Sequence, residues 1–230
     1  LPFDLEIDEY HEEQQSKLSY FDRFKDMKPY FEINEEEWTY IKETFDKDTI
    51  KEKLADILME YEPPYMDITE KECLTNLIKR LNVGNKASNY FQQKNRWSVD
   101  GSVAPGPIRT WENRKFMITL LGSLFTLKVP KVNKGTLRTC IGLRKYICSQ
   151  FKPNVAKGIY DKYKCKNVLD FSAGWGDRLC GFYASDVGEL FVGIDPRKEN
   201  HPIYEKQAEF YQKHSTFFEN DKKHELMCSP

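Results

Sequence analysis

The 230-residue sequence has no apolar run close to the roughly 18 residues that a membrane-spanning helix needs. Its first residues, LPFDLEIDEYHEE, lack the basic segment followed by an apolar segment that marks a secretory signal. No two of its six cysteines have CxxC spacing, and its four histidines complete no zinc pattern. These absences predict an intracellular protein of a reducing compartment, with free thiols, no metal site and no membrane partner.

Charge is unevenly distributed, although the formal net charge is only −1. Residues 1–82 hold 22 acidic and 11 basic residues, so the remaining residues carry a charge of +10. Between residues 109 and 152 there are ten Lys or Arg side chains and one acidic residue, Glu112. Such a segment is typical of nucleic-acid binding, although a solvated helix face gives the same pattern. The residues predicted to contact nucleic acid are Arg109, Arg114, Lys115, Lys131, Lys134 and Arg138.

Three segments are predicted along the chain. Residues 1–82 form an acidic helical region, in which Asn34 suits a helix N-cap and Thr69 has capping-box spacing to Glu72. Residues 83–150 are irregular at first and then form a basic helical segment. Residues 151–230 begin with a helix, because Pro153 suits a first turn, and continue as alternating strands and helices.

The irregular stretch is predicted over residues 82–111, because its glycines and prolines interrupt any long helix. Aromatic residues alternate there with cations: Tyr90, Phe91, Trp97 and Trp111 lie among Lys86, Lys94, Arg96 and Arg109. Such aromatic residues can stack on unpaired bases while the cations hold phosphates. The alternative is a loop that aromatic side chains anchor in a core.

The last segment predicts an α/β fold. The strands NVLDF, ELFVGIDP and HELMCS are separated by the helical patterns GDRLCGFYAS and HPIYEKQAEFYQKHSTFF. Strands that alternate with helices imply a parallel sheet with right-handed crossovers. The expected fold class is therefore a partial Rossmann-like sheet that follows a mainly helical N-terminal region.

One turn in this segment has the features of a ligand site. In NVLDFSAGWGDRL, Asp170 ends a strand, and Gly174 and Gly176 let the backbone approach a ligand before the next helix begins. Asp195 ends the next strand 25 residues later, close to the spacing of about 20 at which an acid binds a ribose.

The details of the turn narrow the choice of ligand. A dinucleotide fingerprint would have a third glycine where this chain has Leu179, and no GxxxxGK phosphate loop is present. A nucleoside without phosphate needs only the two glycines and the ribose acid, and the helix N-terminus can then face a carboxylate. S-adenosylmethionine has this chemistry, because it is an adenosine that bears an amino acid and a sulfonium.

The stretch VLDFSAGWGDRL followed by FVGIDP resembles class I S-adenosylmethionine-dependent methyltransferases, and more narrowly those that modify exocyclic amines of adenine N6 or cytosine N4 in DNA. Their glycine motif runs D-P-F-x-G-x-G, and here Phe171 and Ser172 stand in place of Pro and Phe. The resemblance implies that S-adenosylmethionine is the cofactor. The implied cofactor-binding residues are Lys152, Pro153, Asp170, Phe171, Ser172, Ala173, Gly174, Gly176 and Asp195.

The motif-level resemblance covers residues 151–229. The chain also resembles, more loosely, methyltransferase-like proteins of large DNA viruses and phages. The family's catalytic tetrad, (D/N/S)-P-P-(Y/F), does not follow in this sequence, which ends at MCSP. The chain is therefore expected to be truncated, with a missing segment or another chain completing the sheet. The only Pro-Pro-Tyr is at residues 63–65, after Glu62, where a helix terminator is the favoured interpretation over a catalytic one.

The expected function is methyl transfer to an exocyclic amine of a nucleic-acid base, with adenine N6 in DNA as the first candidate. The catalytic residues remain unknown. The alternative is a non-catalytic structural or complex subunit that keeps a methyltransferase-like half-fold. Another alternative is a methyltransferase of small molecules or proteins, in which the Lys/Arg segment packs internally.

Overall fold

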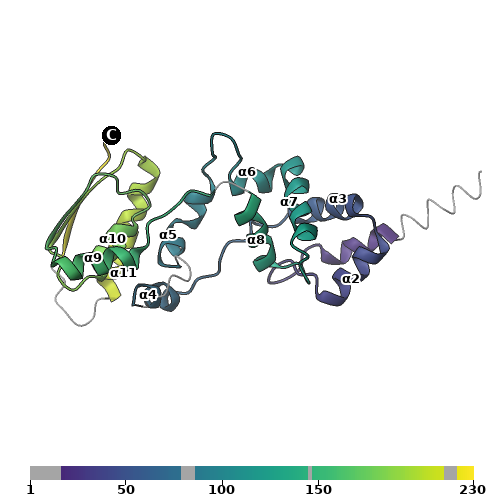
Figure 1. The fold of residues 1–230 in the computed structure, drawn as a ribbon, viewed down its shortest axis with the longest axis horizontal. Helices are drawn as coiled ribbons and strands as arrows, with labels where there is room; N and C mark the ends of the chain where they lie inside the picture. The colour runs from purple at the N-terminus through teal and green to yellow at the C-terminus, as the bar shows by residue number, and fades with distance from the viewer. Residues whose placement is uncertain (1–16, 79–85, 145–146, 215–221) are drawn as a thin grey trace, which may run out of the picture. The chain divides into compact units, whose positions relative to one another are not determined.

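A computed structural model describes residues 17–78, 86–144, 147–214 and 222–230 (Figure 1). It is an α/β protein that is mostly helical, with one small parallel sheet of three strands among the described residues. The chain divides into two compact units. The helical unit comprises residues 1–65 and 100–146, and the sheet unit comprises residues 66–99 and 147–230.

The helical unit contains η1 (Ser19–Phe24), α2 (Glu35–Thr44), α3 (Lys47–Leu58), α6 (Pro107–Glu112), α7 (Arg114–Thr126) and α8 (Lys134–Arg144). The predicted cap of α2 is confirmed: Asn34 accepts a bond from the backbone of Glu37, whose side chain accepts one in return. The core of this unit is apolar and centres on Trp38, which is fully buried and donates its indole N–H to the carbonyl of Val129 at 3.1 Å.

The sheet unit contains α4 (Glu70–Ile78), α5 (Lys86–Trp97), α9 (Pro153–Tyr163), β1 (Asn167–Asp170), α10 (Asp177–Ala184), β2 (Leu190–Ile194), η2 (Lys198–Asn200), α11 (His201–His214) and β3 (Lys223–Met227). The strand order is β1-β2-β3, and both pairs are parallel. The three strands match the strand predictions, the capping box at Thr69 and Glu72 is present, and Pro153 begins α9 as predicted.

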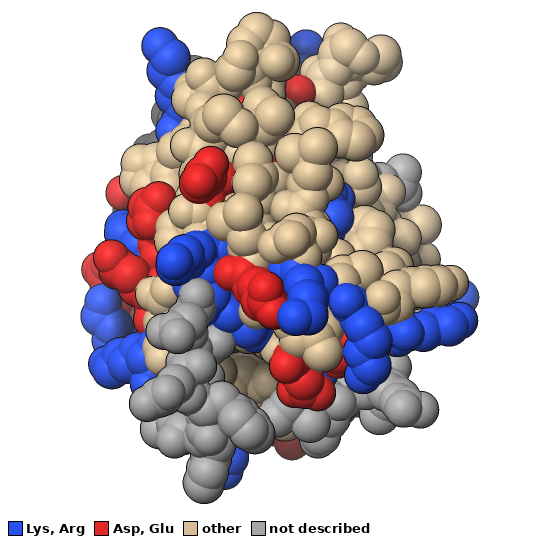
Figure 2. Space-filling model, turned by 90° about the vertical axis from the view of Figure 1, so that its left-hand side faces the viewer, with Lys and Arg blue, Asp and Glu red and all other residues tan. Residues whose placement is uncertain are grey.

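One face of the sheet is covered, and the other is open. Phe191 of β2 is fully buried against a core that includes Tyr160 of α9, Phe182 of α10 and Tyr204 of α11. On the opposite face Leu169 and Met227 are exposed, at 66% and 44%. On the face shown in Figure 2, charged side chains of both signs are most crowded below the centre, and fewer lie above it.

The units do not follow the segment boundaries expected at residues 82 and 150. Residues 66–99 belong with the sheet unit, although residues 100–146 separate them from its remainder in the sequence. The prediction that 82–111 is irregular is wrong for residues 86–97, which form α5, and for residues 107–112, which form α6. In the sequence, the 12 residues of α5 lie between two breakers, Gly101 and Gly84, the second of which is outside the described residues.

All six cysteines are free, and five of them are buried or half-buried. In the described parts of the chain, no helix has both the length and the apolar character that crossing a membrane requires.

Candidate functional site

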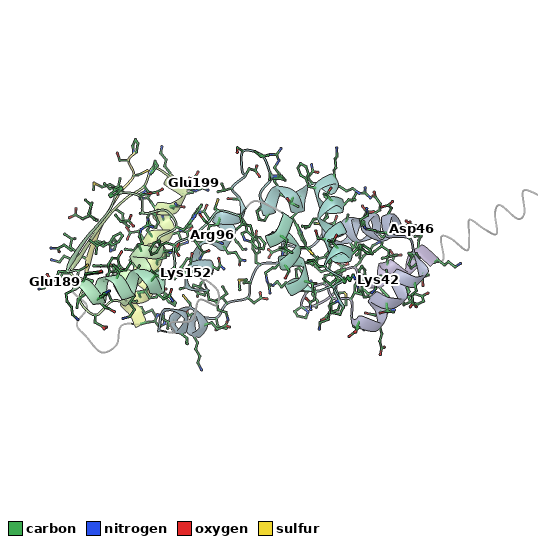
Figure 3. The ribbon with its side chains drawn as sticks, viewed as in Figure 1. Lys42, Asp46, Arg96, Lys152, Glu189 and Glu199 are labelled. Atoms are coloured by element: carbon green, nitrogen blue, oxygen red, sulfur yellow. The ribbon has the colours of Figure 1, made fainter. Side chains whose placement is uncertain are left out.

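The two predicted acids lie at the same edge of the sheet. Asp170 is the last residue of β1, and Asp195 directly follows β2, the neighbouring strand. Both are mostly buried, with 8% of each residue exposed. In Figure 3 the label of Glu189 marks the start of β2, and the label of Glu199 lies beyond its end. Asp170 and Asp195 both lie at the end of the sheet nearer Glu199.

The glycine turn is joined to the end of β2 by a hydrogen bond. The N–H of Gly174 donates to Asp195 Oδ2 at 2.8 Å, and the N–H of Arg197 donates to Asp195 Oδ1 at 2.9 Å. The N–H of Ala173 donates to the carbonyl of Ile194 at 2.9 Å. The turn between β1 and α10 and the end of β2 therefore form one structure, in which the orientation of the Asp195 carboxylate is fixed.

The two glycines serve different purposes. Gly174 has a φ of +59°, and a Cβ there would meet only the carbonyl of Ser172 at 3.7 Å, so one side of this residue is open. Gly176 has a φ of +75°, and a Cβ there would lie 2.1 Å from Oε1 of Gln207. The sequence predicted that both glycines make room for a ligand. At Gly176 the close neighbour is instead a side chain of α11.

Side chains of η2 and α11 hold the outer part of the turn. Asn200 donates to the carbonyl of Gly174 at 2.6 Å, and the hydroxyl of Tyr204 donates to the same carbonyl. Burial raises the pKa of Tyr204, so this hydroxyl remains protonated and can donate. Gln207 donates to the carbonyl of Trp175 at 3.2 Å. These contacts leave the turn little freedom to move.

Asp170 is paired with a cation from the first turn of α10. Arg178 Nε donates to Asp170 Oδ2 at 2.6 Å, and the same guanidinium donates to the carbonyl of Ser172. The guanidinium also lies over the ring of Phe151, 5.3 Å from its centre. This pair neutralises the charge of Asp170. Asp195, the other acid at this edge of the sheet, has no ion pair among the described residues.

The N-terminus of α10 has no side-chain cap, because its N-cap residue is Gly176. Its first residue, Asp177, is almost fully buried, and burial raises the pKa of this carboxyl to about 6, against the opposing influence of Ser88 and Arg96. A helix N-terminus of this kind attracts negative charge. A ligand carboxylate could therefore approach the free N–H groups of the first turn.

Trp175 lies between contacts from two other segments. Its indole N–H donates to the carbonyl of Ser149 at 3.0 Å, and the guanidinium of Arg197 lies 5.4 Å from the centre of its ring. Arg197 in turn donates to Asn95 of α5 at 2.9 Å. The ring is thus held between two chain segments of the sheet unit, and it is half-buried.

The other predicted cofactor residues are distributed around this turn. Ala173 is buried within it, and Ser172 is exposed beside Asp170. Phe171 is 80% exposed and packs little against the described chain. Lys152 is the N-cap of α9, and Pro153 is its buried first residue; α9 packs against α10. Figure 3 labels Lys152 in the segment that leads into α9.

Most of the predicted nucleic-acid residues have partners in their own unit. Arg109 pairs with Asp100 at 3.3 Å, Arg114 with Asp56 at 2.7 Å and also with Glu52, and Lys131 with Glu32 at 3.8 Å. The others are as follows: Arg138 donates to the carbonyls of Pro64 and Tyr65, Lys134 lies over the ring of Tyr30, and Lys115 is exposed. All six lie in the helical unit, whereas the glycine turn lies in the sheet unit.

The aromatic residues of 82–111 favour the core alternative. Trp97 and Trp111 are 4% and 2% exposed, and the Trp111 indole donates to the carbonyl of Tyr61 at 2.7 Å. Tyr90 and Phe91 pack against Phe210 of α11. The two tryptophans are therefore core residues, and Tyr90 and Phe91 are half-buried against α11.

The Pro-Pro-Tyr segment follows α3 without a preceding strand, as a helix terminator does. The carbonyl of Glu62 accepts a bond from Tyr30 at 2.5 Å, and burial raises the pKa of Tyr65 to about 12. Both residues lie in the helical unit, and the glycine turn lies in the other.

Sequence reasoning missed the residues that hold the turn from outside the motif. These are Asn200, Tyr204 and Gln207 of η2 and α11, and Asn95 of α5, which bonds to Asn200 and Arg197. A signal was present in α5, where Ser88, Gln92 and Arg96 recur every four residues, as on one face of a helix. Their position opposite the turn depends on packing between segments that are distant in the sequence.

Comparison with protein-family models, with curated proteins and with solved structures finds no match for this chain. Among the residues that the structure describes, no group of three or more His, Cys, Asp or Glu side chains could hold a metal ion.

Proposed function

We propose that the sheet unit is a Rossmann-like half-fold that binds S-adenosylmethionine, and that the protein transfers its methyl group to an exocyclic amine of a nucleic-acid base. Adenine N6 in DNA is the first candidate. The cofactor, when bound, supplies a methyl group activated by a sulfonium. The chain's own residues bind and orient it at the ends of β1 and β2.

The proposal rests on the bond between the Gly174 N–H and Asp195. This bond places an oriented carboxylate beside a turn with an open side. Each Asp195 oxygen accepts one backbone bond, at 2.8 and 2.9 Å, whereas a carboxylate can accept about four bonds in all. The remaining capacity suits the two hydroxyls of a ribose.

The uncapped N-terminus of α10 supports the same ligand. A GxxxxGK phosphate loop would bring its own Lys, and a dinucleotide-binding turn would have a third glycine, and the sequence has neither here. The carboxylate of an amino acid carries one negative charge, which suits a helix N-terminus without a lysine.

A second candidate function is favoured by the open face of the sheet. Leu169 and Phe171 are 66% and 80% exposed at the free edge of β1, and exposed apolar groups of this kind mark interaction surfaces. The protein would then be a non-catalytic subunit of a complex. The ion pairs of the predicted nucleic-acid residues also weigh against a free cationic surface at Arg109, Arg114 and Lys131.

Calorimetry with S-adenosylhomocysteine tests the proposal. We expect binding by the full chain, and about tenfold weaker binding by Asp195→Asn, because an amide accepts ribose hydroxyls less well than a carboxylate. Glu199→Gln is the matched control, since this exposed acid follows the same strand and should leave the affinity unchanged.

A titration without heat for the unmodified chain would contradict the proposal and favour the non-catalytic candidate. If the cofactor binds, transfer of a radioactive methyl group to DNA, RNA and protein in parallel identifies the class of acceptor. Transfer only to protein would contradict the nucleic-acid part of the proposal.

A further inference from the structure

A buried polar stripe runs along α5, on the side that faces α10. Ser88 and Gln92 are fully buried, and Arg96 is 5% exposed. Burial lowers the pKa of Arg96, and the charge of Asp177 opposes this effect. Arg96 and Asp177 are therefore close neighbours, one on α5 and the other at the first position of α10 (Figure 3 labels Arg96).

Besides the hydroxyl of Ser88, which lies near the Asp177 carboxyl, four polar atoms in this cluster have no hydrogen-bond partner among the residues that the structure describes. They are Nε2 of Gln92, Nε of Arg96, Oδ1 of Asp177 and Oε1 of Gln207. All four residues are at least nine-tenths buried. Buried polar atoms are normally paired, so these four have bonding capacity left for a group that the described chain does not supply.

The chemistry of the four atoms is balanced. Two are donors, one of them on a guanidinium, and two are acceptors, one of them on a carboxylate. A ligand group that pairs with all four must have acceptors with negative charge and donors with positive charge. The α-amino acid group has both, as a carboxylate and an ammonium.

The cluster lies beside the glycine turn. Gln207 contacts Gly176 and donates to the carbonyl of Trp175, and Asp177 directly follows Gly176. We propose that α5, together with Asp177 and Gln207, recognises the amino-acid end of the cofactor, with Gln92 and Arg96 on its carboxylate and Asp177 and Gln207 on its ammonium. This inference rests on the proposed function, and it places the specificity for the amino acid outside the glycine motif.

The cluster connects to solvent through half-exposed residues. Asn95 donates to Gln92 at 3.0 Å and to Asn200 at 2.7 Å, and it accepts a bond from Arg197 at 2.9 Å. Arg197 lies over the ring of Trp175.

Two ligands that differ only at the amino-acid end test the inference. S-adenosylhomocysteine has the α-amino acid group, and 5′-methylthioadenosine lacks it. We expect the unmodified chain to bind the first at least tenfold more tightly by calorimetry. Gln92→Met keeps the side-chain volume and should weaken S-adenosylhomocysteine about tenfold, with 5′-methylthioadenosine changed less than twofold. Arg96→Gln should have a larger effect of the same kind.

Lys94→Met is the matched control, because it removes a charge from the exposed side of the same helix and should change neither affinity. Thermal melting of each variant verifies folding, and Gln92→Met decides the question even if Arg96→Gln does not fold. Equal affinities of the unmodified chain for both ligands, or equal losses for both in Gln92→Met, would overturn the inference while the proposed function stands. If the unmodified chain binds neither ligand, both fail.

Discussion

The two units of this protein differ in what they bury. Among the described residues, the helical unit buries two polar side chains, Thr110 and Ser123, beneath a core of large apolar groups such as Trp38. The sheet unit buries ten, including the ionisable Arg96, Asp170, Asp177 and Asp195. Burying a charge costs free energy unless it is paired, so such residues point to a role beyond folding.

The ionic contacts show the same contrast. In the helical unit, Arg114 bridges Glu52 and Asp56 at the surface, with 47% of its side chain exposed. In the sheet unit, the Asp170 side chain that pairs with Arg178 is 9% exposed. Surface pairs contribute little to stability, whereas buried ones determine geometry. The comparison therefore locates the candidate site in the sheet unit and a stabilising apolar core in the helical unit.

The largest effect is expected from the core of the helical unit. Trp38→Ala should lower the free energy of unfolding by roughly 3–5 kcal/mol, because it empties a fully buried site and removes the bond to Val129. Urea unfolding measures the loss. Tyr40→Ala on the same helix, where the residue is 47% exposed, should cost much less. Equal losses for the two variants would contradict the contrast between core and surface.

The second effect is a pH dependence that belongs to the sheet unit. The pKa of Asp177 is about 6 in the folded state, above its ordinary value of 3.8, because burial disfavours the charged form. The folded state therefore holds this proton to higher pH than the unfolded state. This stabilising contribution is complete below about pH 4 and is lost as pH rises through 6, by roughly 2–3 kcal/mol.

Urea unfolding between pH 4 and 7.5 measures this slope, as the difference between the unmodified chain and Asp177→Asn. Arg96, Arg178 and Ser88 face the carboxyl and are kept in both proteins. Asp48→Asn in the helical unit is the control, since 85% of the Asp48 side chain is exposed. If the Asp177→Asn curve keeps the slope of the unmodified chain, the burial of this carboxyl is not the cause.

The smallest effect concerns the glycine turn. Gly176→Ala should lower the free energy of unfolding by about 1–2 kcal/mol for the left-handed backbone alone, and the contact with Gln207 adds to the loss. Gln207→Ala in the same chain should restore that added part. Gly158→Ala is the control, because Gly158 lies in α9 with open space around it, and it should stabilise by roughly 0.5–1 kcal/mol. Additive losses in the double variant would show that Gly176 and Gln207 do not interact.

Local features of the fold were predictable from single stretches of sequence. The caps at Asn34 and Thr69 and the start of α9 at Pro153 follow from side chains within three residues of the backbone groups they affect. The three strands were predicted for a similar reason, because short apolar runs between helical patterns leave few other assignments. The common edge of Asp170 and Asp195 followed from the parallel order.

Long-range features were not predictable. Nothing near residue 96 in the sequence shows that α5 packs against α10. The irregular segment predicted there was wrong because the glycines that suggested it lie outside the helix. Likewise, the excess of Lys and Arg between residues 109 and 152 did not show that Arg114 and Arg138 bond to residues of the acidic segment. Counting charged residues gives the sign of the net charge of a segment, but the bonding partners of its side chains depend on contacts between distant residues.

The caps, the strands and the turn between β1 and α10 follow from local sequence, because each of these depends on backbone sterics and on neighbours a few residues away. Which side chains surround that turn depends on packing between distant segments. Gln207 came to fill the space that Gly176 leaves, and α5 brought Arg96 to Asp177, because burial of the apolar faces of α5 and α11 against one core fixes what their polar faces meet.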